Sequence, residues 1–152
     1  MANSDDKVSS FHGKNILGVD YGEKVIGLST YKVGIEPFPL LFGRIITEQS
    51  QDILQDLLQI IEDEFIDIVV WGVPYFTDGK ESEMTVKIRK IGQSLEEKIP
   101  SAVSLYYQDE TLSTFEAQER MKNDPRFNFQ VDLKKIDALS ASIIIESFLQ
   151  EK

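Results

Sequence analysis

Acidic side chains occur at the ends of apolar runs and at the start of the last apolar helix, positions from which they could hold a metal ion. They are Asp20, Asp109, Glu110 and Asp137. Carboxylate oxygens are the ligands that Mg²⁺ prefers in proteins. Two such ions roughly 4 Å apart can stabilise the attacking and leaving oxygens of a phosphodiester during its hydrolysis. We therefore treat these acids as candidate catalytic residues for two-metal hydrolysis.

Each acid also has a plain structural explanation. Asp20 lies between glycines, a setting that is common in turns. Asp109 and Glu110 precede a short helix, whose N-terminal dipole favours negative charge. Asp137 could interact favourably with the dipole of its own helix or pair with Lys134. Strand side chains alternate between faces, so one of Asp109 and Glu110 can face a given site, and the spacing leaves open which one.

Composition limits the chemistry. The chain has no cysteine and a single histidine, His12, which excludes thiolate zinc sites and makes oxygen ligation of Mg²⁺ or Mn²⁺ the expected choice. A net charge of −10 opposes binding to nucleic acid. Local basic clusters could offset this charge. They are Lys80, Lys87, Arg89 and Lys90 in one segment and Lys134 with Lys135 in another.

Hydrophobic periodicity predicts an α/β domain with a mixed five-stranded sheet, its first three strands antiparallel and helices on both faces. Period-2 or continuous apolar segments predict strands over 15–20, 25–30, 39–46, 67–72 and 103–107. Amphipathic segments predict helices over 51–65, 84–98, 114–121 and 133–148. The pattern Ser113-Thr-Phe-Glu116 predicts a capping box at the third helix.

The N-terminal segment is polar and has no periodicity. We expect residues 1–14 to be a flexible tail and residues 15–150 to form the domain. No apolar run is long enough to span a bilayer, which predicts a soluble, cytoplasmic protein. The sequence does not distinguish a monomer from a dimer.

Four short motifs, in order and at compatible spacing, resemble those of the YqgF/RuvX family. They are Gly18–Ser29, Gly72–Gly79, Asp109–Thr114 and Asp137–Ala141, within a match over about Ile16 to Leu149. The resemblance implies an RNase H-like nuclease domain. Family members are described as processing the 5′ end of pre-16S ribosomal RNA or as Holliday-junction resolvase homologues.

The resemblance also implies residue roles. Asp20, Glu110 (or its neighbour Asp109) and Asp137 take the place of metal ligands. The positions implied for substrate binding are Lys24, Ser29, Thr114 and Lys134. The implied activity is that of an endonuclease in ribosome biogenesis that uses Mg²⁺ or Mn²⁺ on structured nucleic acid.

Some basic residues of the family are replaced. Val25 follows Lys24 where the family usually has a basic residue, and Thr111 stands in place of an arginine. These changes favour an alternative, a non-catalytic module that binds RNA or a ribosome precursor through a degenerate site. A third reading, an ATP-binding protein of the actin type, needs two such domains, and the chain has room for one.

Overall fold

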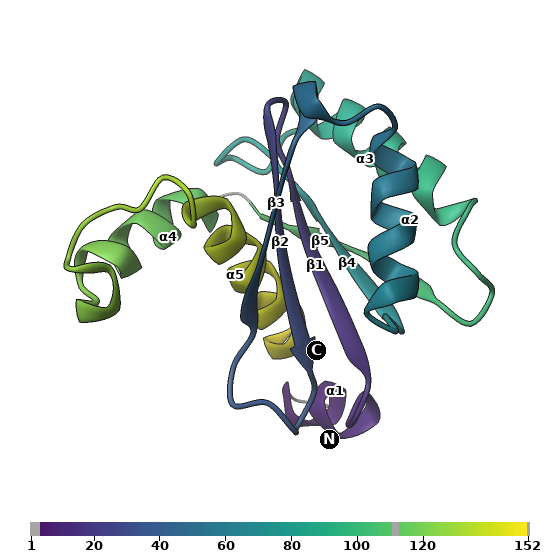
Figure 1. The fold of residues 1–152 in the computed structure, drawn as a ribbon, viewed down its shortest axis with the longest axis horizontal. Helices are drawn as coiled ribbons and strands as arrows, with labels where there is room; N and C mark the ends of the chain where they lie inside the picture. The colour runs from purple at the N-terminus through teal and green to yellow at the C-terminus, as the bar shows by residue number, and fades with distance from the viewer. Residues whose placement is uncertain (1–3, 111–112, 152) are drawn as a thin grey trace.

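Five strands form one mixed sheet in the computed structural model, which describes residues 4–110 and 113–151 (Figure 1). They are β1 (Asn15–Tyr21), β2 (Val25–Lys32), β3 (Leu40–Ile46), β4 (Ile68–Val73) and β5 (Ser104–Asp109). The order across the sheet is β3-β2-β1-β4-β5. β1, β2 and β3 pair antiparallel, whereas β4 joins β1 and β5 joins β4 in parallel. The predicted sheet is thus confirmed.

Helices cover both faces of the sheet, as predicted (Figure 1). One face packs against α2 (Ile53–Asp63) and α3 (Glu83–Glu96), while α5 (Ile136–Gln150) crosses the other. α1 (Ser4–Ser10) and α4 (Ser113–Lys122) contact α5. Two short 3-10 helices, η1 (Thr47–Gln49) and η2 (Pro125–Phe127), complete the described elements.

The last helix differs from its prediction. The sequence predicted one apolar face beginning near Leu133, but α5 begins at Ile136, and Leu133 is 74% exposed. Buried residues occur all around α5, because the sheet lies on one side and α4 and α1 lie on the other. Even so, no helix within residues 4–110 and 113–151 has the length and apolar character needed to cross a membrane.

The N-terminal segment also differs from expectation. Residues 4–10 of the predicted tail form α1, which contacts α5. The Lys7 ammonium donates to the Phe148 carbonyl at 2.7 Å, and the Phe11 ring stacks on the Phe148 ring at 6.0 Å. Apolar contact with α5 therefore orders a segment that shows no periodicity of its own. Residues 1–3 lie outside the described part, and the domain boundary at residue 15 stays a prediction.

Candidate active site

Strand alternation places Asp20 on the sheet face that α5 covers. Leu17 and Val19 of β1 lie in the core beneath α2 and α3, so Gly18 and Asp20 point to the opposite face. Asp20 is the last residue but one of β1 and pairs with Gly27 of β2. The carboxylate therefore stands at the end of a central strand, under the start of α5.

Gly27 brings the start of α5 close to Asp20. A Cβ added at Gly27 would lie 2.0 Å from the Asp137 carbonyl oxygen and 2.9 Å from the Asp137 Cβ. No residue larger than glycine fits there without moving the helix. Asp20 pairs with Gly27 across the β1–β2 ladder, so Asp137 lies near it. Desolvation raises the pKa of Asp20 most, and the charge of Asp137 raises it further.

Glu110 reaches the same place from the end of β5. Its backbone N–H donates to the Val73 carbonyl at 3.1 Å, which continues the pairing with β4 by one residue. A Cβ added at Gly72 would lie 3.2 Å from the Glu110 carboxyl carbon, so the absence of a side chain leaves room for this carboxyl. The Glu110 and Asp20 side chains share a hydrogen bond.

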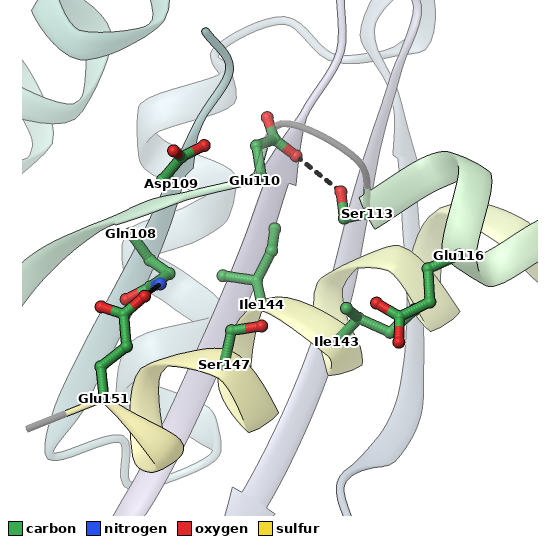
Figure 2. Close-up of a pocket in the computed structure, with 9 residues that line it drawn as sticks. All are labelled: Gln108, Asp109, Glu110, Ser113, Glu116, Ile143, Ile144, Ser147 and Glu151. Carbon is green, nitrogen blue, oxygen red and sulfur yellow. Dashed lines mark hydrogen bonds between the residues drawn. The ribbon is translucent and has the colours of Figure 1, made fainter. Parts of the chain in front are cut away.

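Burial controls the ionisation of this carboxyl pair. Desolvation, followed by the charge of Asp20, raises the pKa of Glu110 to about 10. Desolvation also raises the pKa of Asp20, while the hydrogen bond that Glu110 donates opposes the rise. The Ser113 hydroxyl donates to Glu110 at 3.3 Å and lowers its pKa (Figure 2). Without a cation, the pair therefore keeps a proton at neutral pH.

Asp137 is partly buried, as Asp20 and Glu110 are. Desolvation raises its pKa, and the nearby Arg44 guanidinium on β3 opposes this rise. Arg44 pairs with Gly27 across the β2–β3 ladder, so it borders the same corner of the sheet. Sequence reasoning missed Arg44, although it is the one charged side chain in the strand predicted over 39–46.

The carboxylate oxygens of Asp20 and Glu110 suit a divalent cation. Within residues 4–110 and 113–151, no three acidic or histidine side chains are already arranged as metal ligands. However, the partly buried side chains of Asp20 and Glu110 share a hydrogen bond, and a cation could take the place of the proton in that bond. Their oxygens match the preference of Mg²⁺ and Mn²⁺.

Two cavities meet at Glu110. One, with a volume of about 370 Å³, is lined by Asp20, Glu110, Thr114 and several apolar side chains. The other, of about 280 Å³, lies between the end of β5 and helices α4 and α5 (Figure 2). Asp109 lines this second cavity and is exposed, whereas Asp20 is absent from its lining. The position of Glu110 thus favours Glu110 over Asp109 as the partner of Asp20.

The residues implied for substrate binding are dispersed. Thr114 lines the cavity that contains Asp20, and Lys24 is exposed in the β1–β2 turn. Lys134 is exposed just before α5. Ser29 is fully buried, and its hydroxyl donates to the Leu40 carbonyl at 2.8 Å. The structure therefore gives Ser29 a role in holding β3 against β2.

The predicted basic segment is partly neutralised by its own neighbours. Arg89 forms an ion pair with Glu81 at 2.6 Å, and Lys87 lies 3.9 Å from Glu23. Lys80 and Lys90 are exposed. The expected basic patch stays a prediction, with two of its cations already facing carboxylates.

The capping box predicted at the third helix stays a prediction, because the residue before α4 lies outside the described part. Ser113 is the first residue of α4, and its hydroxyl donates to the Glu110 carboxyl. A capping box that the sequence analysis did not predict lies at α3, formed by Ser82 and Thr85. Sequence reasoning thus found the helix but missed the contact of Ser113 with the carboxyl pair, because side-chain direction depends on how β5 meets α4.

A sheet of this order, with carboxyls from β1 and β5 meeting beneath a crossing helix, defines an RNase H-like α/β protein. Residues 14–151 match the RuvX family, described as "Holliday junction resolvase", and the chain belongs to this family.

Relatives agree with this assignment, and solved structures have a similar fold. Proteins named "Putative pre-16S rRNA nuclease" from Chlamydia abortus and Shewanella oneidensis are 35% and 31% identical to this chain. These matches cover 90% and 91% of the chain, and 91% and 96% of the relatives. The fold resembles Thermus thermophilus RuvC in complex with a Holliday junction substrate, with a TM-score of 0.53, 14% identity, and 89% and 94% coverage. It also resembles the yeast mitochondrial Holliday junction resolvase Ydc2, with a TM-score of 0.52, 11% identity, and 97% and 83% coverage.

Proposed function

We propose that this member of a nuclease family is a metal-dependent endonuclease that hydrolyses phosphodiester bonds in structured nucleic acid. The observation that supports this most is the meeting of the partly buried Asp20 and Glu110 carboxyls beside Asp137 of α5, where desolvation and a neighbouring carboxylate raise the pKa of each. Like charges in so little solvent are costly unless a cation compensates them. Carboxyls with raised pKa values at the end of a central strand are typical of a catalytic site.

Each residue has a distinct role in this proposal. Asp20 and Glu110 hold Mg²⁺ or Mn²⁺, with Asp137 completing the charge from α5. When bound, the metal supplies activation of a water molecule and stabilisation of charge on the scissile phosphate. Ser113 fixes the direction of the Glu110 carboxylate through its hydrogen bond. Thr114, at the rim of the Asp20 cavity, is placed to contact the substrate backbone.

The proposed substrate is the 5′ region of a pre-16S ribosomal RNA, which would place the protein in the cytoplasm. The names of its relatives support this choice, and the family description adds branched DNA as a second substrate to test. Purified protein with Mn²⁺ should cleave the precursor RNA, and Asp20→Asn should abolish cleavage. If Asp20→Asn cleaves as fast as the wild type, the activity belongs to another site and the proposal is wrong.

One observation favours a second candidate, a non-catalytic module that binds RNA. Val25 and Thr111 remove two cations that the family usually has, in a chain whose net charge is −10. This candidate predicts RNA binding that neither Mg²⁺ nor Asp137→Ala changes. The nuclease proposal predicts that both change it, because substrate and metal would share the site.

A further inference from the structure

The cavity above Asp20 and Glu110 has an aromatic rim. Tyr21, Tyr75 and Phe115 line it together with the two carboxyl residues. Its volume of about 370 Å³ lies in the range of pockets that hold small organic groups. The cavity thus places flat apolar surfaces directly beside the groups proposed to act on a phosphodiester.

The β-sheet side of this rim is held in position. The Tyr21 ring packs against the buried Trp71 ring at 5.6 Å. Tyr75 lies beside Arg89, whose guanidinium forms an ion pair with Glu81 at 2.6 Å. A ring packed in this way loses little conformational freedom when a ligand binds, so the Tyr21 ring is preorganised.

The opposite side of the rim comes from α4. Phe115 lies in the first turn of that helix and is 61% exposed, although it borders the cavity. Exposed apolar side chains that are grouped at one place commonly mark a binding surface, and Phe115 adds to the rings of Tyr21 and Tyr75 at this rim. Phe115 and Tyr75 therefore offer ring surfaces to a flat ligand from two separate elements.

The charge of the chain further limits the class of ligand that this cavity can bind. The chain carries a net charge of −10, and Arg89 and Lys87 near this cavity already face carboxylates. Attraction of phosphates by lysine and arginine is therefore weak here. Stacking of bases on aromatic rings is the other main source of affinity for nucleic acid, and it requires bases that are not stacked within a duplex.

We propose that this cavity binds an unpaired nucleobase, stacked against Phe115 and Tyr75, beside the phosphodiester to be cut. The inference rests on the proposed nuclease function and specifies its substrate class as single-stranded or locally unpaired nucleic acid. A continuous duplex would keep its bases out of reach of the cavity.

Binding to a short fluorescently labelled RNA single strand tests this inference. Fluorescence anisotropy is measured in an Asp20→Asn background with Mg²⁺, so that the strand stays intact. Phe115→Ala should raise the Kd about tenfold, the loss expected for one stacked base. Phe115→Leu, which keeps apolar volume but lacks the ring, should show most of this loss. Phe38→Ala removes a phenylalanine that is 50% exposed at another cavity and should leave the Kd unchanged.

Abasic substitution along the strand locates the partner of Phe115. Removal of one base should weaken binding by a similar factor, and Phe115→Ala should then cause no further loss on that abasic strand. Two outcomes overturn the inference: no base position matters, or the losses from Phe115→Ala and from the abasic site multiply. The inference also fails if Phe115→Ala binds the intact strand as tightly as its parent.

Cleavage by the chain with Asp20 intact separates this inference from the proposed function. If a fully paired duplex is cut as fast as an unpaired strand and Phe115→Ala does not matter, the nucleobase site is wrong and the nuclease stands. If the Phe115 coupling is found in binding but the protein cuts nothing, the nuclease is wrong and the nucleobase site stands.

Discussion

The two faces of β1 carry different kinds of residue and pack against different helices. Toward α2 and α3, Leu17 and Val19 fill an apolar core with Trp71. Toward α5, the same strand presents Gly18 and then Asp20. The first face buries apolar side chains, whereas the second lets a helix backbone approach and brings partly buried carboxyls together.

The difference shows where stability and function separate. Apolar burial on the first face stabilises the fold by about 1.5–3 kcal/mol for each fully buried large side chain. On the second face, Gly27 and Gly72 leave space that Asp137 and Glu110 occupy, and this brings acids together against their electrostatic repulsion. Changes to the carboxyls on the second face should therefore affect activity and pH dependence more than folding.

The largest effect is expected from Asp20→Asn. Loss of this carboxylate should slow cleavage by about 1000-fold or more, which corresponds to roughly 4 kcal/mol of transition-state stabilisation. Asp109→Asn is the matched control, because Asp109 is exposed and does not line the Asp20 cavity. Its rate should stay near that of the wild type. Equal losses of cleavage rate in the two variants would show that the direction in which each carboxylate points does not decide its role.

Gly27→Ala tests the close approach of α5. The added Cβ would lie 2.0 Å from the Asp137 carbonyl oxygen, so α5 must shift. We expect the free energy of unfolding in urea to fall by about 1–3 kcal/mol and cleavage to fall at least tenfold. Gly43→Ala on β3 adds a Cβ that meets nothing within 4 Å, and its activity should be retained. A Gly27→Ala protein of wild-type activity would contradict the placement of Asp137.

The pH dependence of stability tests the shared proton. The pKa of Glu110 is about 10 in the folded chain and 4.5 for an unperturbed carboxyl, so the folded state binds the extra proton between these values. Without metal, the contribution of Glu110 to the free energy of unfolding should therefore be largest near pH 4.5 and fall toward pH 10.

Glu110→Gln should flatten this decline, because the amide can still donate to Asp20 and does not titrate. Glu62→Gln, at an exposed position on α2, should leave the decline unchanged. Urea unfolding in EDTA at several pH values measures both. A wild-type stability that rises across this pH range would show that Glu110 is ionised in the folded chain.

The smallest effect is expected from Ser113→Ala. The lost hydrogen bond to Glu110 is 3.3 Å long and contributes about 0.5–1.5 kcal/mol, equivalent to a few-fold to tenfold loss in kcat. Ser113→Thr keeps the hydroxyl and should restore most of the rate. If the alanine and threonine variants behave alike, Ser113 acts through helix packing alone.

The sequence predicted the sheet and most helices because their signals are local. The alternation in β1 and β2 and the apolar stripe of α2 depend on neighbouring residues. α1 and the extent of α5 were missed because both depend on contacts far apart in the chain, such as Lys7 with Phe148. Burial on all sides of α5 removes the one-sided pattern on which sequence reasoning relies.

The candidate site was predicted in part. Motif resemblance placed Asp20, Glu110 and Asp137 together, and the alternation rule showed that Asp109 and Glu110 lie on different faces. Which face α5 would cover could not be read from the sequence, so the choice between them required the packing of Gly72 against Glu110. The close approach of α5 to Gly27 could not be predicted from the sequence for the same reason.

Calorimetric titration of the metal-free protein with Mn²⁺ at neutral pH tests the shared site most directly. The account predicts millimolar or tighter binding with release of a proton, detected as a dependence of the heat on the buffer's ionisation enthalpy. Asp20→Asn and Glu110→Gln should lose this binding, and Asp109→Asn should keep it. Undiminished binding in Asp20→Asn, or binding by the wild type without proton release, would contradict the claim that Asp20 and Glu110 hold one cation.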